Sequence, residues 1–278
     1  MSSASPTREL AGGKLLIDEP AAGVVRLTIS NPAKRNALDH PILDAITATL
    51  AELGAAGPAD AGTRCVLLTG AGGMFSAGYD IGEIPEEEFE ERAERLVAHP
   101  FTEAIDALQA FPWPTLAMLP GHTIGGGLEL ALACDLRVAQ DAIKLGMPPA
   151  KLSLVYSHTG IRRFIDAIGA ARTRELFLLG SYIDAATALA WGLVNRVAPA
   201  ERLEAASLEL AAELAGNAPL SQAGNKRVIA ALLDAEGELA TEVEQELIEL
   251  RRASFASADM REGMKAFAEK RPPRWQGR

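Results

Sequence analysis

The stretch "GHTIGGGLELALACD", residues 121–135, places three consecutive glycines, Gly125 to Gly127, directly before an apolar helical run. It follows the apolar segment "TLAML", residues 115–119, which predicts a strand. A glycine inside regular structure costs roughly 0.5–1 kcal/mol relative to alanine. A helix N-terminus leaves N–H groups unpaired and carries partial positive charge, so a bare backbone there lets a ligand oxygen approach closely. The stretch therefore predicts either an anion or oxyanion site or close packing of the helix on a strand.

A second glycine-rich turn, "TGAGGMFSAGYDIGEI" at residues 69–84, follows the apolar segment "RCVLL" in the same way. Turns at the ends of two parallel strands can converge, and two N–H donors on one oxygen form an oxyanion hole, in which losing one donor costs about 2.7–4 kcal/mol. Competing motifs fail on spacing. A dinucleotide fingerprint needs a small residue where Phe75 stands, and a nucleophile elbow around Ser76 needs glycine in place of Met74.

Apolar segments alternate with helical patterns through the first two thirds of the chain. Strands are expected at residues 24–30, 64–70, 115–121, 135–140, 142–146 and 193–198. Helices are expected at 39–54, at 160–180 with a break at Gly169, and at 184–192. From about residue 202 the strand patterns stop, and Ala/Leu/Glu-rich helices continue to about residue 270. The pattern predicts an α/β core followed by a helical C-terminal region.

Composition narrows the class of protein. The 278 residues are 48% hydrophobic and 23% charged, as in ordinary soluble domains, and no apolar run reaches the roughly 18 residues of a membrane span. The polar residues 1–13 are expected to form a mobile leader on a cytoplasmic protein. A net charge of −10 argues against nucleic acid as a partner. Cys65 and Cys134 lie in apolar settings and are expected to be buried reduced thiols, and the histidines show no metal-ligand spacing.

Four segments occur in a recognisable order: "NPAKRNALD", "FSAGYDIGEI", "GHTIGGGLELALACD" and "AFAEKRPPRWQG". On these the chain, from about Lys14 to Gly277, resembles the enoyl-CoA hydratase/isomerase superfamily, the crotonase fold. The resemblance implies an α/β spiral of ββα units with the acyl-CoA site over residues 14–205, and a helical trimerisation region over 206–278. It also implies an acyl-CoA thioester as substrate, no cofactor beyond its coenzyme A moiety, and a homotrimer or dimer of trimers, with no membrane or nucleic-acid partner.

The resemblance assigns catalytic positions. The oxyanion donors would be the backbone N–H groups of Tyr79 and Gly126, holding the thioester carbonyl as an enolate forms. Glu129 stands where hydratases of this superfamily keep one of two catalytic carboxylates, and a helix glutamate that is only solvated or ion-paired is the plainer alternative. The second carboxylate is absent, because Pro149 stands at its position and proline cannot transfer a proton.

Residues 149–161 follow the pattern P-x-x-L-x-x-x-Y-x-x-x-G-I, which is similar to the methylmalonyl-CoA decarboxylase members of the superfamily. Loss of CO2 from a malonyl-type thioester gives the enolate directly, so a missing base harms a decarboxylase less than a hydratase. Tyr156 could orient the leaving carboxylate or supply a proton, or it could be a core tyrosine. His158 could reach the same pocket, or it could belong to a helix start marked by Ser157 and Thr159.

The resemblance also places residues around coenzyme A. These are Lys34, Arg35, Ala77, Asp80, Ile81, Phe267 and Lys270. Ala77, Asp80 and Ile81 would face the adenine, and Lys34 and Arg35 would lie near the phosphates, where basic groups suit an anionic ligand. Phe267 and Lys270 would close the site, from this chain or from a neighbouring subunit. For each of these residues a solvated surface position is the alternative, and the glutamate-rich segment 83–95 is expected to form a mobile wall of the acyl pocket.

The sequence thus predicts an acyl-CoA enzyme that works through a stabilised thioester enolate, with decarboxylation of a short malonyl-type CoA as the favoured reaction. Two alternatives stay open. One is an enoyl-CoA hydratase or isomerase that uses Glu129 as its sole carboxylate. The other is a non-catalytic acyl-CoA-binding subunit.

Overall fold

The computed structural model describes residues 8–55, 62–80, 88, 95, 97–237 and 241–274. Its strands are β1 (Arg8–Leu10), β2 (Leu15–Ala21), β3 (Val24–Ile29), β4 (Cys65–Gly70), β5 (Thr115–Leu119), β6 (Thr123–Ile124), β7 (Leu136–Gln140), β8 (Lys144–Gly146), β9 (Tyr182–Asp184) and β10 (Arg196–Ala198). Its α-helices are α1 (His40–Ala55), α4 (Thr102–Ala110), α5 (Gly126–Ala133), α6 (His158–Leu179), α7 (Ala185–Trp191), α8 (Leu203–Gly216), α9 (Pro219–Gly237), α10 (Thr241–Ala256) and α11 (Ala258–Ala268). The short helical turns are η1 (Ala11–Gly13), η2 (Pro32–Lys34), η4 (Val97–Phe101), η5 (Pro149–Lys151) and η6 (Ala200–Arg202).

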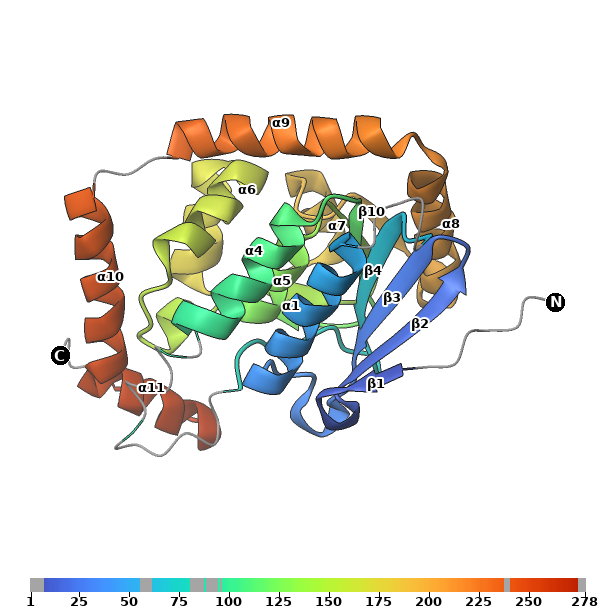
Figure 1. Cartoon of the computed structure of the whole chain (residues 1–278). Helices are drawn as coiled ribbons and strands as arrows, with labels where there is room; N and C mark the ends of the chain where they lie inside the picture. The colour runs from blue at the N-terminus through green and yellow to red at the C-terminus, as the bar shows by residue number, and fades with distance from the viewer. Residues whose placement is uncertain are drawn as a thin grey trace.

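A seven-stranded sheet in the order β1-β2-β3-β4-β5-β7-β10 forms the centre of the molecule (Figure 1). Strands β3, β4, β5, β7 and β10 run parallel, and β1 and β2 add an antiparallel edge. A smaller sheet, β6-β8-β9, lies beside it. The carboxyl ends of β4 and β5 lie at the same edge of the main sheet because these two strands are parallel neighbours. This topology delivers the two glycine-rich turns to one place.

Helices cover both faces of the main sheet. Alternating residues of β4 separate into two clusters: Leu67 packs with Leu210 of α8, and Val66 and Leu68 pack in the cluster that holds Ile42 of α1. All residues of β4 are buried, which explains why this strand has a continuous apolar run instead of alternation. Helix α8 therefore belongs to the core of the α/β unit, although its composition resembles that of the helices that follow it.

The predicted elements between residues 24 and 198 are confirmed, with shorter strands and with helix ends shifted by one or two residues. Asp39 caps α1 by accepting from the Ile42 N–H at 3.1 Å, and Asp184 caps α7 by accepting from the Thr187 N–H at 2.8 Å. At Gly169, the predicted break, α6 has a non-helical backbone with φ 76° and ψ 160°. Short cap and break signals act locally, which is why the sequence identifies them correctly.

The N-terminal prediction needs correction. Residues 8–13 belong to the folded domain, because β1 pairs with β2 from Arg8↔Ile17 to Leu10↔Leu15 and η1 connects the two strands. Only residues 1–7 of the predicted leader lie outside the described residues. The sequence analysis also missed β2, in which Asp18, Glu19 and Pro20 interrupt the apolar pattern. Proline is tolerated there because the register of β2 on β3 shifts between Asp18 and Ala21.

The last helices wrap around the α/β unit. In Figure 1, α9 crosses the top of the molecule, and α10 and α11 descend along the side opposite β1. Phe255 and Met260, from α10 and α11, pack with Leu152 and Tyr79, so this C-terminal segment reaches the turn after β4. No helix in the described part of the chain is long and apolar enough to cross a membrane.

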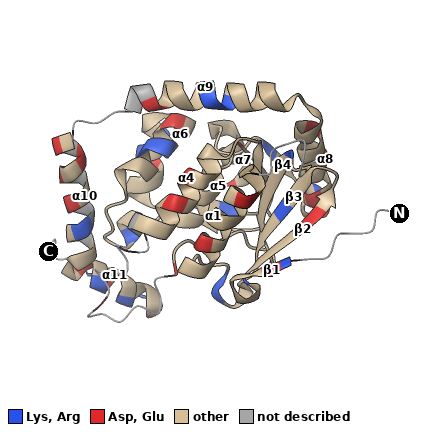
Figure 2. Cartoon of the chain, in the orientation of Figure 1, with Lys and Arg blue, Asp and Glu red and all other residues tan. Residues whose placement is uncertain are grey.

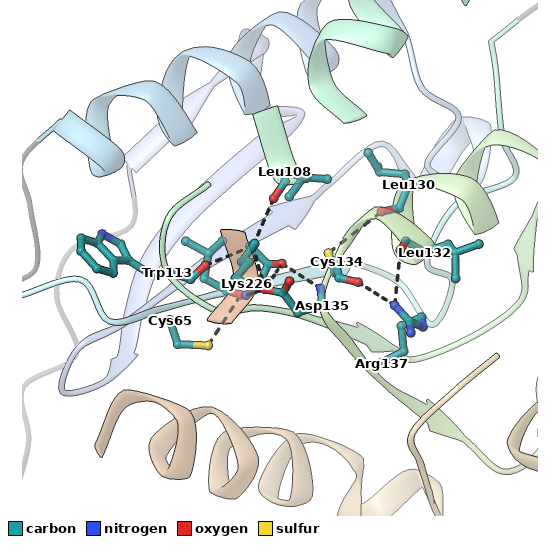
Figure 3. Close-up of polar contacts among 11 residues, drawn as sticks. Cys65, Leu108, Trp113, Leu130, Leu132, Cys134, Asp135, Arg137 and Lys226 are labelled. Carbon is teal, nitrogen blue, oxygen red and sulfur yellow. Dashed lines mark hydrogen bonds and ion pairs between the residues drawn. The ribbon is translucent and has the colours of Figure 1, made fainter. Parts of the chain in front are cut away.

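A partly buried polar cluster fixes the end of α5 (Figure 3). Asp135 accepts from the Thr115 N–H at 2.7 Å and from Lys226 Nζ of α9 at 2.8 Å. Arg137 donates to the Cys134 carbonyl at 2.6 Å and to the Leu193 carbonyl at 2.7 Å. Cys65 and Cys134 are free and buried, as predicted, and burial raises the pKa of both thiols to about 12. The helix that follows the three glycines is thereby held at its far end.

Candidate active site

The turns after β4 and β5 lie against each other. Ser76 and Thr123 form a parallel bridge, and the Ile124 N–H donates to the Ser76 carbonyl at 3.0 Å. Two residues beyond the bridge, Gly78 has a φ of 98°. A Cβ atom at Gly78 would lie 3.2 Å from the Gly126 nitrogen. The structure therefore brings the peptides of residues 78–79 next to the start of α5, as the sequence predicted.

The orientation of each candidate N–H follows from the carbonyl of the preceding residue. In a trans peptide the C=O and N–H point in opposite directions, and no described peptide bond is cis. The Gly78 carbonyl accepts from the Leu38 N–H at 2.8 Å, so the Tyr79 N–H points away from Leu38. The Gly125 carbonyl accepts from the Leu128 N–H at 2.9 Å within α5, so the Gly126 N–H points out of the helix N-terminus. Each N–H is thus directed outward from its own segment.

Glycine occupies each position of the triplet for a different physical reason. Gly125 has φ 57° and ψ −129°, a backbone conformation that side chains disfavour. A Cβ at Gly126 would lie 2.5 Å from Cε1 of Tyr79, and one at Gly127 would lie 2.6 Å from Cβ of Ser76. Close packing, one of the two alternatives raised by the sequence, is present at Gly126 and Gly127, and the oxyanion site stays a prediction.

Glu129 projects from the first turn of α5 into the protein interior, where its residue is only 2% exposed. Its Oε2 accepts from the Tyr156 hydroxyl at 2.5 Å, and its Oε1 accepts from Arg163 Nη1 at 3.2 Å. Gly160 of α6 lies directly above it, because a Cβ there would be 2.9 Å from Glu129 Oε1. Both carboxylate oxygens therefore have donors from the chain itself.

Burial raises the pKa of Glu129, and the positive charge of Arg163 and the Tyr156 hydrogen bond oppose this rise. The pKa of Tyr156 is raised well above its ordinary value, first by burial and then by the neighbouring Glu129. Both effects favour the neutral forms of the two groups. A carboxyl group with a raised pKa is better suited to proton transfer than an ordinary one.

Tyr79 extends this polar chain toward the surface. Its hydroxyl lies 3.0 Å from the Tyr156 hydroxyl, and the two rings are nearly parallel with centroids 6.5 Å apart. Phe101 packs edge-on against the Tyr79 ring at 4.8 Å. The Tyr79 ring also covers Gly126, so the side chain of one predicted oxyanion residue lies over the other.

The predicted coenzyme A residues are brought together only in part. Lys34 Nζ lies 2.8 Å from Asp80 Oδ2, and the Ala77 N–H donates to the Arg35 carbonyl at 3.0 Å. These four residues therefore form one patch beside the turn after β4. Ile81 lies outside the described residues, as does all of segment 83–95 except Glu88 and Arg95.

Phe267 and Lys270 lie near and just beyond the end of α11, and the Lys270 N–H donates to the Phe267 carbonyl at 3.2 Å. The Phe267 residue is 72% exposed. Among the described residues, no hydrogen bond or ion pair joins Phe267 or Lys270 to the patch of Lys34, Arg35, Ala77 and Asp80. The structure of one chain thus leaves their predicted closing role to be tested.

Two further predicted positions have clear surroundings. Pro149 is buried at the start of η5, so the position expected for a second carboxylate is occupied by a group that cannot ionise. His158 is the first residue of α6, and its Nε2 lies 3.4 Å from Glu244 Oε1 of α10. Ser157 caps the helix by accepting from the Gly160 N–H at 3.1 Å, which confirms the helix-start interpretation.

The sequence analysis missed Arg163 and Gly160. Arg163 also donates to Gln109 Oε1 at 3.0 Å and pairs with Asp106 Oδ1 at 3.5 Å, both on α4. The arginines among the apolar residues of "GIRRFIDAIG" could have indicated such a residue, because a charged group on the buried face of a helix needs a partner. Whether Arg162 or Arg163 faces the protein interior depends on how α6 is rotated about its own axis where it packs on α5. Among the residues that the structure describes, no group of three or more His, Cys, Asp or Glu side chains could hold a metal ion.

Comparisons with known proteins agree with this geometry. The family model described as enoyl-CoA hydratase/isomerase matches residues 19–278. A "Probable enoyl-CoA hydratase" of Bacillus subtilis is 34% identical over 258 residues, which cover 91% of this chain and 95% of the relative. The methylmalonyl-CoA decarboxylase of Escherichia coli is 32% identical over 246 residues, which cover 88% and 91% of the two chains.

Solved structures are similar over almost the whole chain. Methylmalonyl-CoA decarboxylase complexed with 2S-carboxypropyl CoA superposes with a TM-score of 0.85 at 29% identity, covering 95% of this chain and 98% of that one. An enoyl-CoA hydratase from Mycobacterium avium subsp. paratuberculosis superposes with a TM-score of 0.80 at 27% identity over the same shares. The fold predicted from the four sequence segments is therefore confirmed, and the chain belongs to the enoyl-CoA hydratase/isomerase family.

Proposed function

We propose that this protein decarboxylates a short malonyl-type coenzyme A thioester, through an enolate held between the peptide N–H groups of Tyr79 and Gly126. The observation that carries the proposal is the surroundings of the one carboxylate at the predicted catalytic positions. Glu129 is buried with Tyr156 on one oxygen and Arg163 on the other, and Pro149 occupies the position of a second carboxylate. At position 149, two-carboxylate hydration would find a proline in place of its second carboxylate.

The chemistry needs little from the protein beyond charge stabilisation. The electron pair of the broken C–C bond becomes the enolate, whose negative oxygen lies at the two N–H groups, and CO2 leaves. No base is required for this step, because the carboxylate itself leaves. One proton must then be delivered to the α-carbon, and the raised pKa of Glu129 supports it as the source of that proton. The proposal needs no cofactor beyond the coenzyme A moiety of the substrate.

The comparisons support this choice without deciding it. Three methylmalonyl-CoA decarboxylase structures superpose with TM-scores of 0.83 to 0.85, whereas the hydratase of Mycobacterium avium reaches 0.80. Sequence identity slightly favours a hydratase, at 34% for the probable enoyl-CoA hydratase of Bacillus subtilis against 32% for the decarboxylase. The second candidate function is therefore hydration or isomerisation of an enoyl-CoA with Glu129 as the sole carboxylate.

Coenzyme A binding would use the patch formed by Lys34, Arg35, Ala77 and Asp80. The ammonium group of Lys34 and the guanidinium of Arg35 suit the phosphates, while the Lys34–Asp80 ion pair positions one of them. Phe267 and Lys270 are proposed to complete the site. The change Lys34→Met should raise KM for a coenzyme A thioester and leave kcat nearly unchanged. It removes an interaction that is equally strong in the bound ground state and in the transition state.

One experiment separates the candidates. The purified protein is incubated with methylmalonyl-CoA and, separately, with crotonyl-CoA, and the products are followed by mass spectrometry. Propionyl-CoA without hydration supports the proposal, and 3-hydroxybutyryl-CoA formation overturns it in favour of the hydratase. If neither product forms, isothermal titration with both thioesters tests the remaining alternative, a non-catalytic acyl-CoA-binding subunit. If either thioester is turned over, Glu129→Gln should lower that activity at least tenfold and leave the circular dichroism spectrum unchanged.

A further inference from the structure

Arg163 connects the buried carboxyl group of Glu129 to helix α4 at the protein surface. Its Nη1 donates to Glu129 Oε1 at 3.2 Å, and its Nε and Nη2 both donate to Gln109 Oε1, at 3.1 and 3.0 Å. Gln109 is exposed, Glu129 is buried, and the Arg163 side chain, which is 15% exposed, lies between them. The guanidinium group therefore links a surface residue of α4 to the carboxyl group at the predicted catalytic position.

The residue that fixes the guanidinium group on α4 is neutral. Gln109 offers one amide oxygen to two N–H groups of Arg163, and an arginine presents such donors in a rigid fork. The acidic neighbour on the same helix is Asp106, whose Oδ1 lies 3.5 Å from Arg163 Nη2 and whose side chain is 64% exposed. An ion pair so open to water is weak. The positive charge of Arg163 therefore acts mainly on Glu129.

Glu129 keeps hydrogen-bonding capacity for a substrate group beside these contacts. An ionised carboxylate has about four lone-pair sites, and each oxygen of Glu129 accepts one hydrogen bond from the described residues, Oε1 from Arg163 and Oε2 from Tyr156. Two donors from different turns of the chain fix the orientation of the carboxyl group. We propose that Arg163 and Gln109 are positioning residues, which hold Glu129 in place and determine how readily it gives its proton to the acyl group.

This inference rests on the proposed function and describes how the chain prepares its proton donor. When Glu129 protonates the α-carbon of the enolate, the carbon–carbon double bond supplies the electron pair of the new C–H bond, and the carbonyl group re-forms. Glu129 is left as a buried carboxylate, to which Arg163 and Tyr156 donate. Without the guanidinium group, burial would hold the proton on Glu129. A proton from solvent then restores the carboxyl group.

The groups that act on Glu129 come from the elements packed around α5. Burial raises the pKa of its carboxyl group, Arg163 of α6 and the hydrogen bond from Tyr156 lower it, and Asp106 of α4 raises it. Tyr79, from the turn after β4, lies behind Tyr156, with the two hydroxyl groups 3.0 Å apart. Among these groups, Arg163 is the one that a neutral surface residue holds in place, so its effect can be altered from α4.

Two near-isosteric changes at exposed positions of α4 test the inference with opposite signs. Gln109→Glu adds a negative charge at the guanidinium group and should move the titration midpoint of Glu129 to higher pH, whereas Asp106→Asn removes one and should move it to lower pH. In protein labelled with 13C at the glutamate side-chain carboxyl groups, the Glu129 resonance is the one that Glu129→Gln removes. Gln245→Glu, at an exposed position of α10, makes the same change of charge and should leave the midpoint unmoved.

Changes of Arg163 itself should have a larger effect. An opposite charge within about 4–6 Å lowers the pKa of a carboxyl group by about 1–3 units, so Arg163→Met should move the Glu129 midpoint upward by an amount in this range. Arg163→Lys keeps the charge without the fork, and its midpoint should lie between those of the wild type and Arg163→Met. An unmoved midpoint in Arg163→Met overturns the inference. Shifts of the same sign in Gln109→Glu and Asp106→Asn, or no shift in either, overturn it as well.

Kinetics separate this inference from the proposed function. If Glu129 is the proton donor of a decarboxylase, kcat falls as the pH rises through its midpoint, and if Glu129 is the base of a hydratase, kcat rises there. Gln109→Glu should move either change in kcat to higher pH and leave KM unchanged, because Gln109 acts on Glu129 through Arg163. A kcat that rises with pH overturns the proposed function, and a pH profile that stays in place overturns the role of Gln109. If neither thioester is turned over, the 13C titration still tests the inference.

Discussion

Glu129 places a carboxyl group in the interior between a guanidinium and a phenol, and its pKa is set by burial against the charge of Arg163. Arg163→Met removes the cation, so the pKa of Glu129 should rise further. A buried carboxyl group with a raised pKa stabilises the fold most at low pH, and that contribution is lost as the pH rises through the folded pKa. Breaking a buried pair costs roughly 3–5 kcal/mol while the remaining charge stays ionised.

We therefore expect the Arg163→Met variant to lose most stability at high pH and much less at acidic pH, where Glu129 is neutral. Urea unfolding at a series of pH values measures this difference. Arg162→Met is the control, since Arg162 pairs with Asp166 in a partly exposed i,i+4 ion pair, and such pairs contribute about 0–1 kcal/mol. Equal pH dependence in the two variants would contradict the assignment of Arg163 to Glu129.

Substitution of Gly126 by alanine is expected to lower the activity of the site. In Gly126→Ala the new Cβ would meet the Tyr79 ring at 2.5 Å, so the ring must leave the start of α5. We expect a loss of at least tenfold in kcat, because a small misplacement at a reacting centre costs about 10²-fold. Gly224→Ala is the control: its Cβ meets nothing within 4 Å, and helix propensity predicts a gain of up to about 1 kcal/mol. Full activity of Gly126→Ala would contradict the placement of the site.

At the scale of elements, the partly buried cation of Lys226 helps to attach α9 to the α/β unit. Lys226 Nζ donates to Asp135 Oδ2 at 2.8 Å and to the Leu108 and Trp113 carbonyls at 3.5 and 3.4 Å (Figure 3). Lys226→Met leaves these acceptors with fewer donors, which costs about 1–3 kcal/mol. Hydrogen exchange should accelerate in α9 and at the end of α5, and Arg227→Met, an exposed neighbour, should leave exchange unchanged. Unchanged exchange in both variants would show that apolar packing alone holds α9.

At the scale of the whole molecule, α9 presents an apolar surface. Its exposed apolar side chains are Leu220, Val228, Ile229, Leu232 and Leu233. Figure 2 shows most of α9 in tan, whereas α10 carries several acidic positions followed by a basic one. Five exposed apolar side chains on one helix of a chain with a net charge of −10 are typical of a protein-binding surface. The predicted homotrimer or dimer of trimers would use such a surface.

The 29.4 kDa chain is therefore expected to sediment as a trimer or hexamer. The double change Ile229→Glu and Leu232→Glu places two charges on this surface and should shift the protein to monomers, as measured by sedimentation velocity. A matched pair of changes on the acidic helix α10, Glu242→Gln and Glu246→Gln, should leave the assembly intact. A wild-type monomer at micromolar concentration would contradict the oligomer prediction.

Most strands and helices between residues 24 and 198, the caps at Asp39 and Asp184, and the break at Gly169 could be predicted from the sequence by itself. These features depend on residues close together in the chain, whereas the meeting of the two glycine-rich turns depends on the parallel pairing of β4 and β5. The absence of a second carboxylate at Pro149 is likewise a property of the sequence alone.

Only the tertiary structure decided which groups surround Glu129. Glu129, Tyr79 and the pair Tyr156 and Arg163 come from three segments far apart in the chain, and their approach depends on the packing of α6 on α5 and of the turn after β4 on both. The same holds for β1, whose short polar sequence forms a strand only because β2 offers it an edge. Long-range packing selects one arrangement from many that local patterns allow, and the chemistry of the site arises at that level.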